Sequence, residues 1–289
     1  MEVAIEIKMD KKMKVMGLAT CFNRKDKTLQ ALKSLVEGNT DIDFEFVICD
    51  DNSKDGTAEA LSALDNTYVV MGDGNSFYTG GMRLAMKRAL ELLDEAKPDF
   101  VMLFNDDVDF YDGAISGLVR RYNEKGNKNA IFVGPTCEDD LISLSYGGIA
   151  RKSNFAPKFR IVKADSREGR KVNTFNANCV LIPTGLFVKT GIMDSVYNHS
   201  LGDFDYGYML GRKGGEIYVS DEYVGVCPNN PTTGTWNDPS LKRIERFKKK
   251  ESIKGVPFGE FFHYLLKNYN FLTAVIFSLT PYARILLGK

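Results

Sequence analysis

The segment DFVMLFNDDVDFYDG, residues 99–113, arranges five acidic residues around one short apolar run. Its first part, FVMLF, is short and continuously apolar, which is typical of a strand buried in a sheet. Asp106, Asp107 and Asp109 follow directly at the end of that run. Carboxylates this close together repel one another unless a cation joins them. The segment therefore predicts a buried strand whose end carries a cation site.

The chemistry of this cluster favours a divalent metal ion. Hard oxygen ligands suit Mg²⁺ or Mn²⁺, and Mg²⁺ usually takes one or two carboxylates and completes its shell with substrate phosphates and water. The alternative is a turn closed by one carboxylate, with Asp112 capping the next helix. That alternative explains one or two of the acids but not the whole NDDVD sequence, so we favour the metal.

Outward from this segment, the first half of the chain alternates strand-like and helix-like runs. Apolar runs predict strands at residues 14–20, 44–50, 67–71, 100–104 and 130–135, and helical periodicity predicts helices at residues 26–38, 53–64 and 80–96. This alternation is typical of parallel βαβ units. Right-handed crossovers place the carboxyl ends of such strands at one edge of the sheet, where ligands bind.

Polar clusters follow four of the predicted strands, at residues 20–24, 50–53, 72–75 and 105–107. Asp50 and Asp51 are suited to accept hydrogen bonds from a nucleobase or ribose, while Ser53 or Asp55 can cap the next helix. The glycines of GDGNSFYTGG, residues 72–81, permit close backbone approach, and amides near Gly80 can face an anion. This loop is neither a Walker A motif nor a dinucleotide fingerprint.

The second half of the chain has a different pattern. Residues 153–171 are polar and basic and predict a loop, whereas residues 173–183 and 216–226 predict strands. Within the cluster HSLGDFDYGYMLGRKGG, residues 199–215, the part GDFDYGYMLGRKGG, residues 202–215, predicts a helix in which Asp203 and Asp205 do not share a face. One of these acids can point into a cleft while the other caps the helix. From Cys227 the chain becomes polar, and we place a soft boundary there.

Composition excludes several classes of protein. Lys plus Arg and Asp plus Glu each total 38, so no net field attracts nucleic acid. The five cysteines form no CxxC pair, which fits a reducing cytoplasm rather than a disulfide framework or a zinc site. No apolar window is long enough for a spanning helix. Residues 241–254 hold seven basic and two acidic residues before an aromatic segment, which predicts either an interfacial membrane anchor or an amphipathic helix packed on the domain.

Five motifs in order resemble those of family 2 glycosyltransferases, in particular the rhamnosyltransferase-like branch from bacterial surface polysaccharide synthesis. They are TCFNR, CDDNSKDGT, GNSFYTGGMRLAMKRAL, FNDDV and GDFDYGYMLGRKG, between residues 14 and 226. The resemblance implies the α/β GT-A fold, with a Rossmann-like, mostly parallel central sheet flanked by helices and a helical C-terminal extension. It divides the chain into a leader (1–13), a nucleotide-sugar-binding half (14–140), an acceptor-binding half (141–226) and a basic and aromatic helical extension (227–289).

The resemblance also implies a reaction. We expect an inverting transfer of a sugar from a UDP- or dTDP-linked donor to a glycan or lipid-linked acceptor of the cell wall or capsule. Asp203 is expected to be the catalytic base, with Asp205 as the alternative, and Asp107, with Asp109 as a second candidate, to hold Mg²⁺ or Mn²⁺. The expected nucleotide-sugar contacts are Thr20, Phe22, Asn23, Arg24, Asp50, Asp51, Asn52, Asn75, Gly80, Gly81, Arg83, Asn105 and Asp106, and the expected acceptor contacts are Asn178, His199 and Trp236.

Three departures from the family pattern leave the donor open. Asn105 replaces the first aspartate of the metal motif, Gly202 replaces an acid before the base, and Arg83 stands where Asn is common. The competing hypotheses are an inactive nucleotide-sugar-binding or assembly protein, a sugar-nucleotide pyrophosphorylase and a glycoside hydrolase. We expect a cytoplasmic protein, and contact with the inner face of the cell membrane is left open.

Overall fold

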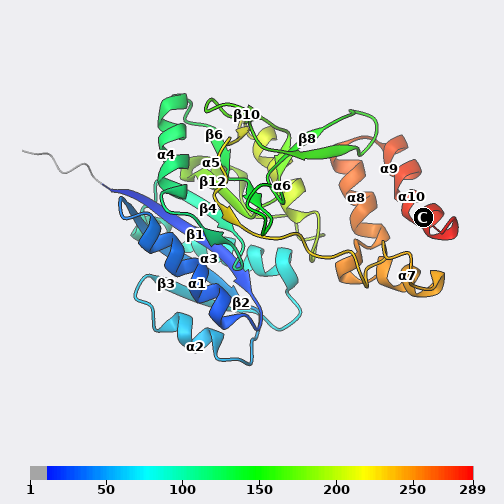
Figure 1. Cartoon of the computed structure of the whole chain (residues 1–289), viewed down its shortest axis with the longest axis horizontal. Helices are drawn as coiled ribbons and strands as arrows, with labels where there is room; N and C mark the ends of the chain where they lie inside the picture. Colours follow the sequence, from blue (N-terminus) through cyan, green and yellow to red (C-terminus); the bar gives the residue numbers. More distant parts are fainter. Residues whose placement is uncertain (1–11, 289) are drawn as a thin grey trace, which may run out of the picture.

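The predicted apolar runs form one central sheet, shown in Figure 1, in a computed structural model that describes residues 12–288. Its eight strands lie in the order β10-β13-β6-β12-β4-β1-β2-β3. Strands β3, β2, β1 and β4 are parallel, β12 runs antiparallel to both β4 and β6, and β10 runs antiparallel to β13. The strands are β1 (Met13–Cys21), β2 (Ile42–Asp50), β3 (Thr67–Met71), β4 (Phe100–Phe104), β6 (Ala130–Val133), β10 (Arg170–Lys171), β12 (Cys179–Pro183) and β13 (Glu216–Val219).

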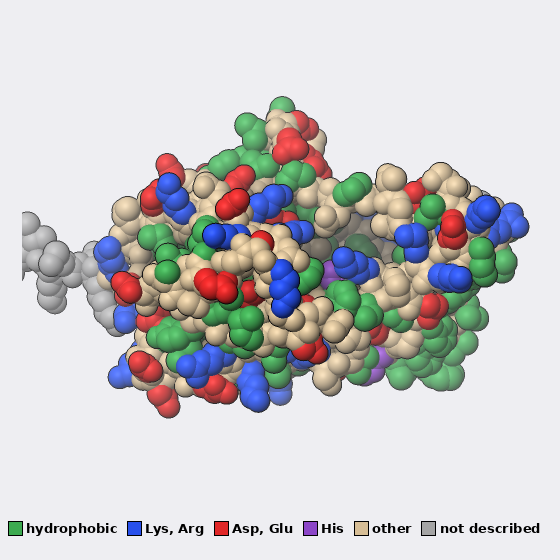
Figure 2. All heavy atoms as spheres, turned by 90° about the horizontal axis from the view of Figure 1, so that it is seen from below, with side chains coloured by type: hydrophobic (Ala, Val, Ile, Leu, Met, Phe, Trp, Pro, Cys, Tyr) green, Lys and Arg blue, Asp and Glu red, His purple; other side chains and the backbone are tan. Residues whose placement is uncertain are grey.

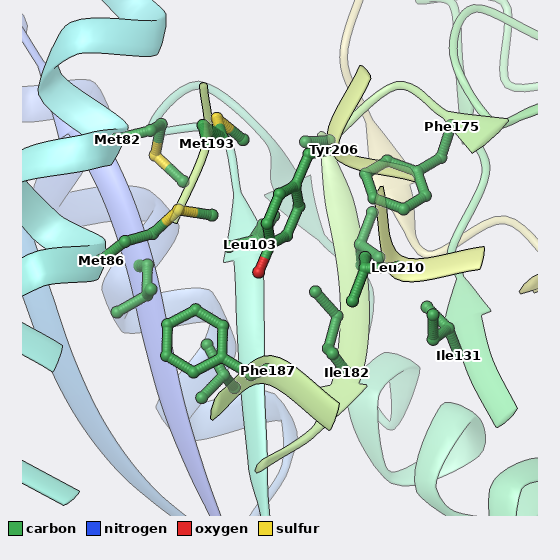
Figure 3. Packing of buried hydrophobic residues seen from close by; sticks show 14 of the residues in the cluster. Met82, Met86, Leu103, Ile131, Phe175, Ile182, Phe187, Met193, Tyr206 and Leu210 are labelled. Atoms are coloured by element: carbon green, nitrogen blue, oxygen red, sulfur yellow. The ribbon is translucent and has the colours of Figure 1, made fainter. Parts of the chain in front are cut away.

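Helices cover both faces of this sheet. On one face, α3, α5 and α6 contribute Met82, Phe187 and Tyr206 to a buried cluster over β4 and β12 (Figure 3). On the other face, α1 and α4 bury Leu35 and Leu118. The fold is therefore the expected α/β sandwich with a mostly parallel sheet. The helices are α1 (Lys25–Gly38), α2 (Thr57–Ser62), α3 (Phe77–Ala96), α4 (Ala114–Lys125), α5 (Thr184–Thr190) and α6 (Gly202–Arg212).

Two small sheets extend the second half of the chain. One has the order β11-β8-β9 and the other β5-β14-β7. The prediction of a loop over residues 153–171 was wrong in part, because β9 and β10 lie there. Strand β9 pairs with the preceding strand β8 in a hairpin, and β10 pairs with β13, which is distant in sequence. The strands are β5 (Asp109–Phe110), β7 (Thr136–Cys137), β8 (Gly148–Arg151), β9 (Phe159–Val162), β11 (Thr174–Phe175) and β14 (Gly225–Val226).

The C-terminal extension forms a group of helices at one end of the molecule (Figure 1). It comprises α7 (Arg243–Lys250), the 3₁₀ turn η1 (Ile253–Gly255), α8 (Phe258–Asn268), α9 (Phe271–Ser278) and α10 (Thr280–Leu286). Helix α8 packs on α6, since Lys267 Nζ and Asn268 Nδ2 donate to the buried Asp205 carboxylate at 2.7 and 2.8 Å. Within residues 12–288, no helix is both long and apolar enough to cross a bilayer.

Two further expectations concern the N-terminal leader and the five cysteines. Most of the leader predicted for residues 1–13 lies outside the described residues, and β1 already begins at Met13. All five cysteines are buried and unpaired, as the absence of a CxxC pair indicated.

Replacing Lys267 with Met is expected to destabilise the protein, because the Lys267 ammonium group lies 2.7 Å from both the fully buried Asp205 and the partly buried Asp194. The Asp205 side chain is fully buried, and its other basic neighbour, Arg212, is 3.9 Å away. Removing one partner of a buried ion pair leaves the other charge uncompensated, so the free energy of unfolding should fall by about 3 kcal/mol. Urea denaturation measures this. Lys33→Met, which breaks the exposed Lys33–Glu37 pair, should change the free energy by less than about 0.5 kcal/mol. Equal effects of the two substitutions would contradict the role of Lys267 as the counter-ion.

Candidate active site

A cavity of about 550 Å³ opens at the carboxyl edge of the parallel strands. The space-filling view in Figure 2 shows the surface hollowed between the main body and the C-terminal helices. Its walls come from the ends of β1 and β4, the entry to α3, the segment before β12, the start of α6 and the turn η1. The lining includes Thr20, Phe22, Arg24, Asp51, Phe77, Tyr78, Asn105, Asp106, Asp107, Tyr146, Asn176, Asn178, His199, Asp203 and Lys254.

An ion-pair cluster lies at the end of β4. Arg24 Nη1, at the N-terminus of α1, lies 2.7 Å from Asp107 Oδ2 and 3.4 Å from Asp106 Oδ1. Thr28 donates its hydroxyl to the other oxygen of Asp106 at 3.3 Å. Burial raises the pKa of Asp106 to about 6, against the opposing charge of Arg24. In this structure Arg24 is therefore the cation that the acidic segment requires.

The same carboxylates fit a metal ion only if the substrate completes its coordination. Among residues 12–288 no group of three or more His, Cys, Asp or Glu side chains is placed to hold a metal. Asp107 is partly exposed in the cavity, beside Asn105 and the Asp106 carboxylate. One or two carboxylates with phosphate oxygens are a usual Mg²⁺ environment. Asp109, the second candidate ligand, is exposed on β5 and does not line the cavity.

Asp51 shapes the nucleotide side of the cavity. Its Oδ1 accepts from the amides of Gly74 and Ser76 at 2.9 and 3.2 Å, and its Oδ2 accepts from Phe77 at 3.1 Å. The carboxylate at the end of β2 thus fixes the loop that leads into α3. Asp51 was predicted as a direct nucleotide contact. It lines the cavity, and its Oδ2 accepts only one of the three amide hydrogen bonds, so that role stays a prediction.

Asp203 lies in the first turn of α6, in the wall of the same cavity as Asp107. Its Oδ1 accepts from the Phe204 amide at 2.8 Å and its Oδ2 from the Ala177 amide at 3.3 Å. Burial raises the pKa of Asp203 to about 6, and these amides oppose the shift only in part. A carboxylate with this pKa is ionised at neutral pH and accepts a proton more readily than an ordinary aspartate.

Three polar atoms around Asp203 have no hydrogen-bond partner within residues 12–288. They are the Tyr78 hydroxyl, Asn176 Oδ1 and His199 Nδ1, and all three residues line the cavity. Burial, and then the charge of Asp203, raises the pKa of Tyr78, while burial, and then nearby Lys254, lowers the pKa of His199. Buried polar groups are normally paired, so this part of the cavity is suited to a hydroxyl-rich ligand.

The structure divides the predicted site residues into two sets. Ten line the cavity: Thr20, Phe22, Arg24, Asp51, Asn105, Asp106, Asp107, Asn178, His199 and Asp203. Ten do not: Asn23, Asp50, Asn52, Asn75, Gly80, Gly81, Arg83, Asp109, Asp205 and Trp236.

Several residues of the second set support the cavity from behind. A Cβ at Gly81 would lie 2.2 Å from Thr20 Oγ1, so this glycine allows α3 to approach β1. The Gly80 amide donates to the Asn198 carbonyl at 3.2 Å instead of facing an anion. Arg83 donates to the carbonyls of Asp194 and Tyr197, ahead of His199.

Two predicted roles change in this structure. Asp205 was the alternative base, but Lys267 and Asn268 hold its carboxylate outside the cavity, where it anchors α8. Trp236 was an acceptor candidate, but its ring lies 5.6 Å from the Arg284 guanidinium, within the C-terminal extension. Neither side chain is placed to reach a substrate in the cavity.

Sequence reasoning missed several polar residues of the cavity, among them Tyr78, Tyr146, Asn230 and Lys254. Tyr78 lies inside the quoted GNSFYTGG segment. The prediction for this segment used its glycines and assigned no role to the neighbouring aromatic residues Phe77 and Tyr78. Lys254 comes from η1, about fifty residues after Asp203, in the basic run that was predicted to be either an interfacial membrane anchor or an amphipathic helix. Only the packing of α8 on α6 brings that run to the cavity, so no local signal identified Lys254.

Comparison with known families decides the class of this protein. The sequence profile of glycosyl transferase family 2 matches residues 18–166, just over half of the chain. The chain is a family 2 glycosyltransferase. Its matched region contains the first four quoted motifs, including FNDDV, and its α/β architecture is the GT-A fold. A search among curated proteins found no match.

Solved structures share the fold of this glycosyltransferase at low sequence identity. The mannosyltransferase PcManGT from Pyrobaculum calidifontis, in complex with GDP-Man and Mn²⁺, is 12% identical with a TM-score of 0.56, over 96% of this chain and 74% of that one. S. aureus TarS 1-349, in complex with UDP-GlcNAc, is 16% identical with a TM-score of 0.55, over 96% and 72%. GalNAc-T7 with UDP, GalNAc and Mn²⁺ is 12% identical with a TM-score of 0.55, over 80% and 47%.

Replacing Arg24 with Gln is expected to raise the pKa of Asp106 further. Arg24 opposes the upward shift that burial imposes on the pKa of this carboxyl, and without it only the Thr28 hydrogen bond opposes burial and the charge of Asp107. A folded-state pKa above the unfolded value destabilises the protein as pH rises through it, so the melting temperature should fall more at pH 8 than at pH 5. Carboxyl-carbon NMR titration locates the midpoint. Arg88→Gln, which breaks the exposed pair with Glu91, should leave the midpoint of Asp106 unmoved. An unchanged midpoint in Arg24→Gln would contradict this coupling.

Proposed function

We propose that this family 2 glycosyltransferase transfers a sugar, with inversion, from a nucleoside-diphosphate sugar to a glycan or lipid-linked glycan acceptor. The observation that supports it best is the Asp203 carboxylate, which has a raised pKa and shares one cavity with Asp107. We extend this to bacterial surface polysaccharide synthesis, as in the rhamnosyltransferase-like branch, on the sequence motifs alone. A lipid-linked acceptor would be met at the inner face of the cell membrane.

Asp203 is the proposed base. An alcohol is a poor nucleophile until it loses its proton, and a carboxylate within hydrogen-bond reach can take that proton as the new bond forms. The Phe204 and Ala177 amides fix the carboxylate, so it can be aimed at one acceptor hydroxyl. Burial keeps its basicity above that of an ordinary aspartate.

The proposed acceptor subsite surrounds this base. The unpaired Tyr78 hydroxyl, Asn176 Oδ1 and His199 Nδ1 offer hydrogen bonds to the hydroxyl groups of a sugar ring. Asn178 and Tyr146 line the cavity beside them. A ligand that satisfies these atoms recovers the free energy that their burial without partners costs, and this favours a sugar over an apolar substrate.

Asp107, with Asn105 and Asp106 beside it, is the proposed site for Mg²⁺ or Mn²⁺. A metal held there would supply Lewis-acid stabilisation to the negative charge that grows on the leaving diphosphate. Arg24 shares the Asp107 carboxylate in the structure and is placed to exchange it for a donor phosphate, because a guanidinium binds either anion. The PcManGT and GalNAc-T7 structures, which both hold Mn²⁺, support this assignment.

Lys254 is the proposed second cation at the donor or acceptor phosphate. It lines the cavity from η1 and is exposed, near enough to His199 to lower its pKa. An ammonium group is a point charge suited to an anion that enters from solvent. The alternative function, an inactive nucleotide-sugar-binding protein of the same fold, would use these cations but not the base.

Replacing Asp203 with Asn is expected to abolish turnover while donor binding persists. The loss should be about 10²- to 10⁴-fold, the usual contribution of a general base. In the wild type, turnover should fall as pH drops below about 6, because protonated Asp203 cannot accept a proton. Release of nucleoside diphosphate from a panel of UDP-, dTDP- and GDP-sugars with Mn²⁺ measures the rate, and calorimetry measures donor binding.

Asp109→Asn is the matched control, since Asp109 is an exposed acid outside the cavity. It should turn over at the wild-type rate. A wild type that binds a donor but never releases nucleoside diphosphate would favour the inactive binder. If Asp203→Asn turned over at the wild-type rate, Asp203 would not be the base.

Replacing Lys254 with Met is expected to weaken donor or acceptor binding about tenfold, the effect of losing one charge-assisted hydrogen bond. Lys254→Arg should recover much of that loss, because the charge is kept. Lys249→Met, an exposed lysine of α7 outside the cavity, is the control and should bind as the wild type does. KM values for both substrates, measured without lipid, show which substrate Lys254 contacts. Unchanged KM values for both would exclude Lys254 from the site.

A further inference from the structure

Helix α9 exposes its large apolar residues and buries its small and polar ones, the reverse of the usual amphipathic pattern. Its small and polar residues Thr273, Ala274 and Ser278 are 4%, 0% and 1% exposed and pack inward. Its large apolar residues face solvent, with Phe271 and Leu272 at 67% and 66% exposure. A surface helix of a soluble domain normally buries its apolar stripe and exposes its polar one. The outer face of α9 therefore lacks the partner that its side chains require.

The apolar surface continues beyond the first turn of α9. The exposed residues recur at positions i, i+1, i+4, i+5 and i+8, which is one continuous helical face. Thr273 donates its hydroxyl to the carbonyl of Phe155, whose own ring is 78% exposed beside α9. We name as the apolar face the exposed residues Phe155, Phe271, Leu272, Val275, Ile276, Leu279, Leu286 and Leu287.

Positive charge is concentrated in the same extension. Residues 241–289 contain ten Lys and Arg against three Glu, although the whole chain is neutral, so residues 1–240 carry a compensating excess of acids. Six of these cations are exposed: Lys242, Arg243, Lys248, Lys249, Lys254 and Arg284. The Phe247 ring of α7 lies 6.1 Å from Tyr282 of α10, so the basic helix α7 packs beside α10, the helix that follows α9. Figure 2 shows green hydrophobic side chains gathered over this end, with blue Lys and Arg beside them.

We propose that the apolar face docks on an anionic lipid bilayer, with the exposed basic residues of α7 on the headgroups. Apolar side chains that enter the acyl boundary, rimmed by cations that attract anionic lipid, are what interfacial helices present. A second copy of the chain is a poorer occupant, because a two-fold interface would bring two basic extensions together. The bilayer satisfies both the apolar surface and its positive rim.

This docking bears on the cavity, since η1 supplies Lys254 to the cavity and lies next to α7. The bilayer would therefore lie near the entrance through which an acceptor arrives. The position of the bilayer near the acceptor entrance matters only if the proposed function is correct, whereas the binding of the apolar face to lipid does not depend on it. Lipid binding and the proposed function can therefore be disproved separately.

Flotation of the full chain with lipid vesicles tests the proposal. The wild type should float with vesicles of phosphatidylcholine and phosphatidylglycerol, float much less with phosphatidylcholine alone, and lose binding as salt is raised. The double substitution Phe271→Gln/Leu272→Gln should weaken vesicle binding at least about tenfold, because it removes the two most exposed apolar side chains of α9. Both side chains are exposed, so the fold should persist.

Two matched controls separate the apolar face and its basic rim from general effects. Leu141→Gln/Ile142→Gln changes two equally exposed apolar residues on a distant loop and should float as the wild type does. Lys248→Glu/Lys249→Glu should lose most binding to the anionic vesicles, whereas Lys87→Glu, on exposed α3 surface, should not. Donor binding without vesicles should be unchanged in every variant, so a failure here leaves the proposed function standing.

Three outcomes would overturn the proposal. They are a wild type that floats with neither vesicle, one that floats equally with both, and a Phe271→Gln/Leu272→Gln protein that floats as well as the wild type. Light scattering adds a fourth. A wild-type dimer that Phe271→Gln/Leu272→Gln converts to a monomer, with no flotation of either, would assign the apolar face to a second copy.

Discussion

The cluster of Arg24, Asp106 and Asp107 is the constraint around which this molecule is organised. Four parallel strands bring polar ends to one edge, and the carboxylates at the end of β4 are the most costly of these polar groups to leave unpaired. Arg24 compensates them from the first turn of α1, at 2.7 Å from Asp107. Because the compensation comes from one arginine side chain and not from a fixed set of ligands, the proposed function can place a metal ion on Asp107 while Arg24 turns to a donor phosphate. A permanent all-protein metal site would not be exchangeable in this way.

The parallel half of the fold could be predicted from sequence because its signals are local. The strand predicted at residues 67–71 and the one at 100–104 have the observed bounds of β3 and β4. Strand β12 illustrates what could not be predicted. It was identified as a strand, but its place between β4 and β6, antiparallel to both, depends on pairing with segments far away in sequence. That pairing carries Asn176 and Asn178 across to the cavity.

The candidate site was predictable where a side chain follows a strand directly, as for Thr20, Asp51 and Asp107. The position of a site residue was not predictable where a nearby residue adopts a backbone conformation that its side chain disfavours. Phe77 and Leu201 both have positive φ, 51° and 66°, a conformation that bulky residues rarely adopt. These residues begin α3 and α6 and thereby orient Tyr78 and Asp203. Such conformations persist only where the surrounding structure imposes them, and they gather at functional sites.

The turn that carries Lys254 shows the same principle in the C-terminal extension. Gly255 packs so closely on α7 that a Cβ there would lie 1.8 Å from the Lys249 carbonyl oxygen, which excludes any other residue. Val256, a β-branched residue, follows with a φ of 62°, and the buried Lys250 ammonium donates to its carbonyl. The close contact of Gly255 and the positive φ of Val256 fix the turn between α7 and α8. The exposed Lys254 therefore has a defined position and does not lie on a flexible linker. The extension is thus built as a rigid wall of the cavity, and a surface that docks α9 would hold that wall in a defined position relative to the acceptor.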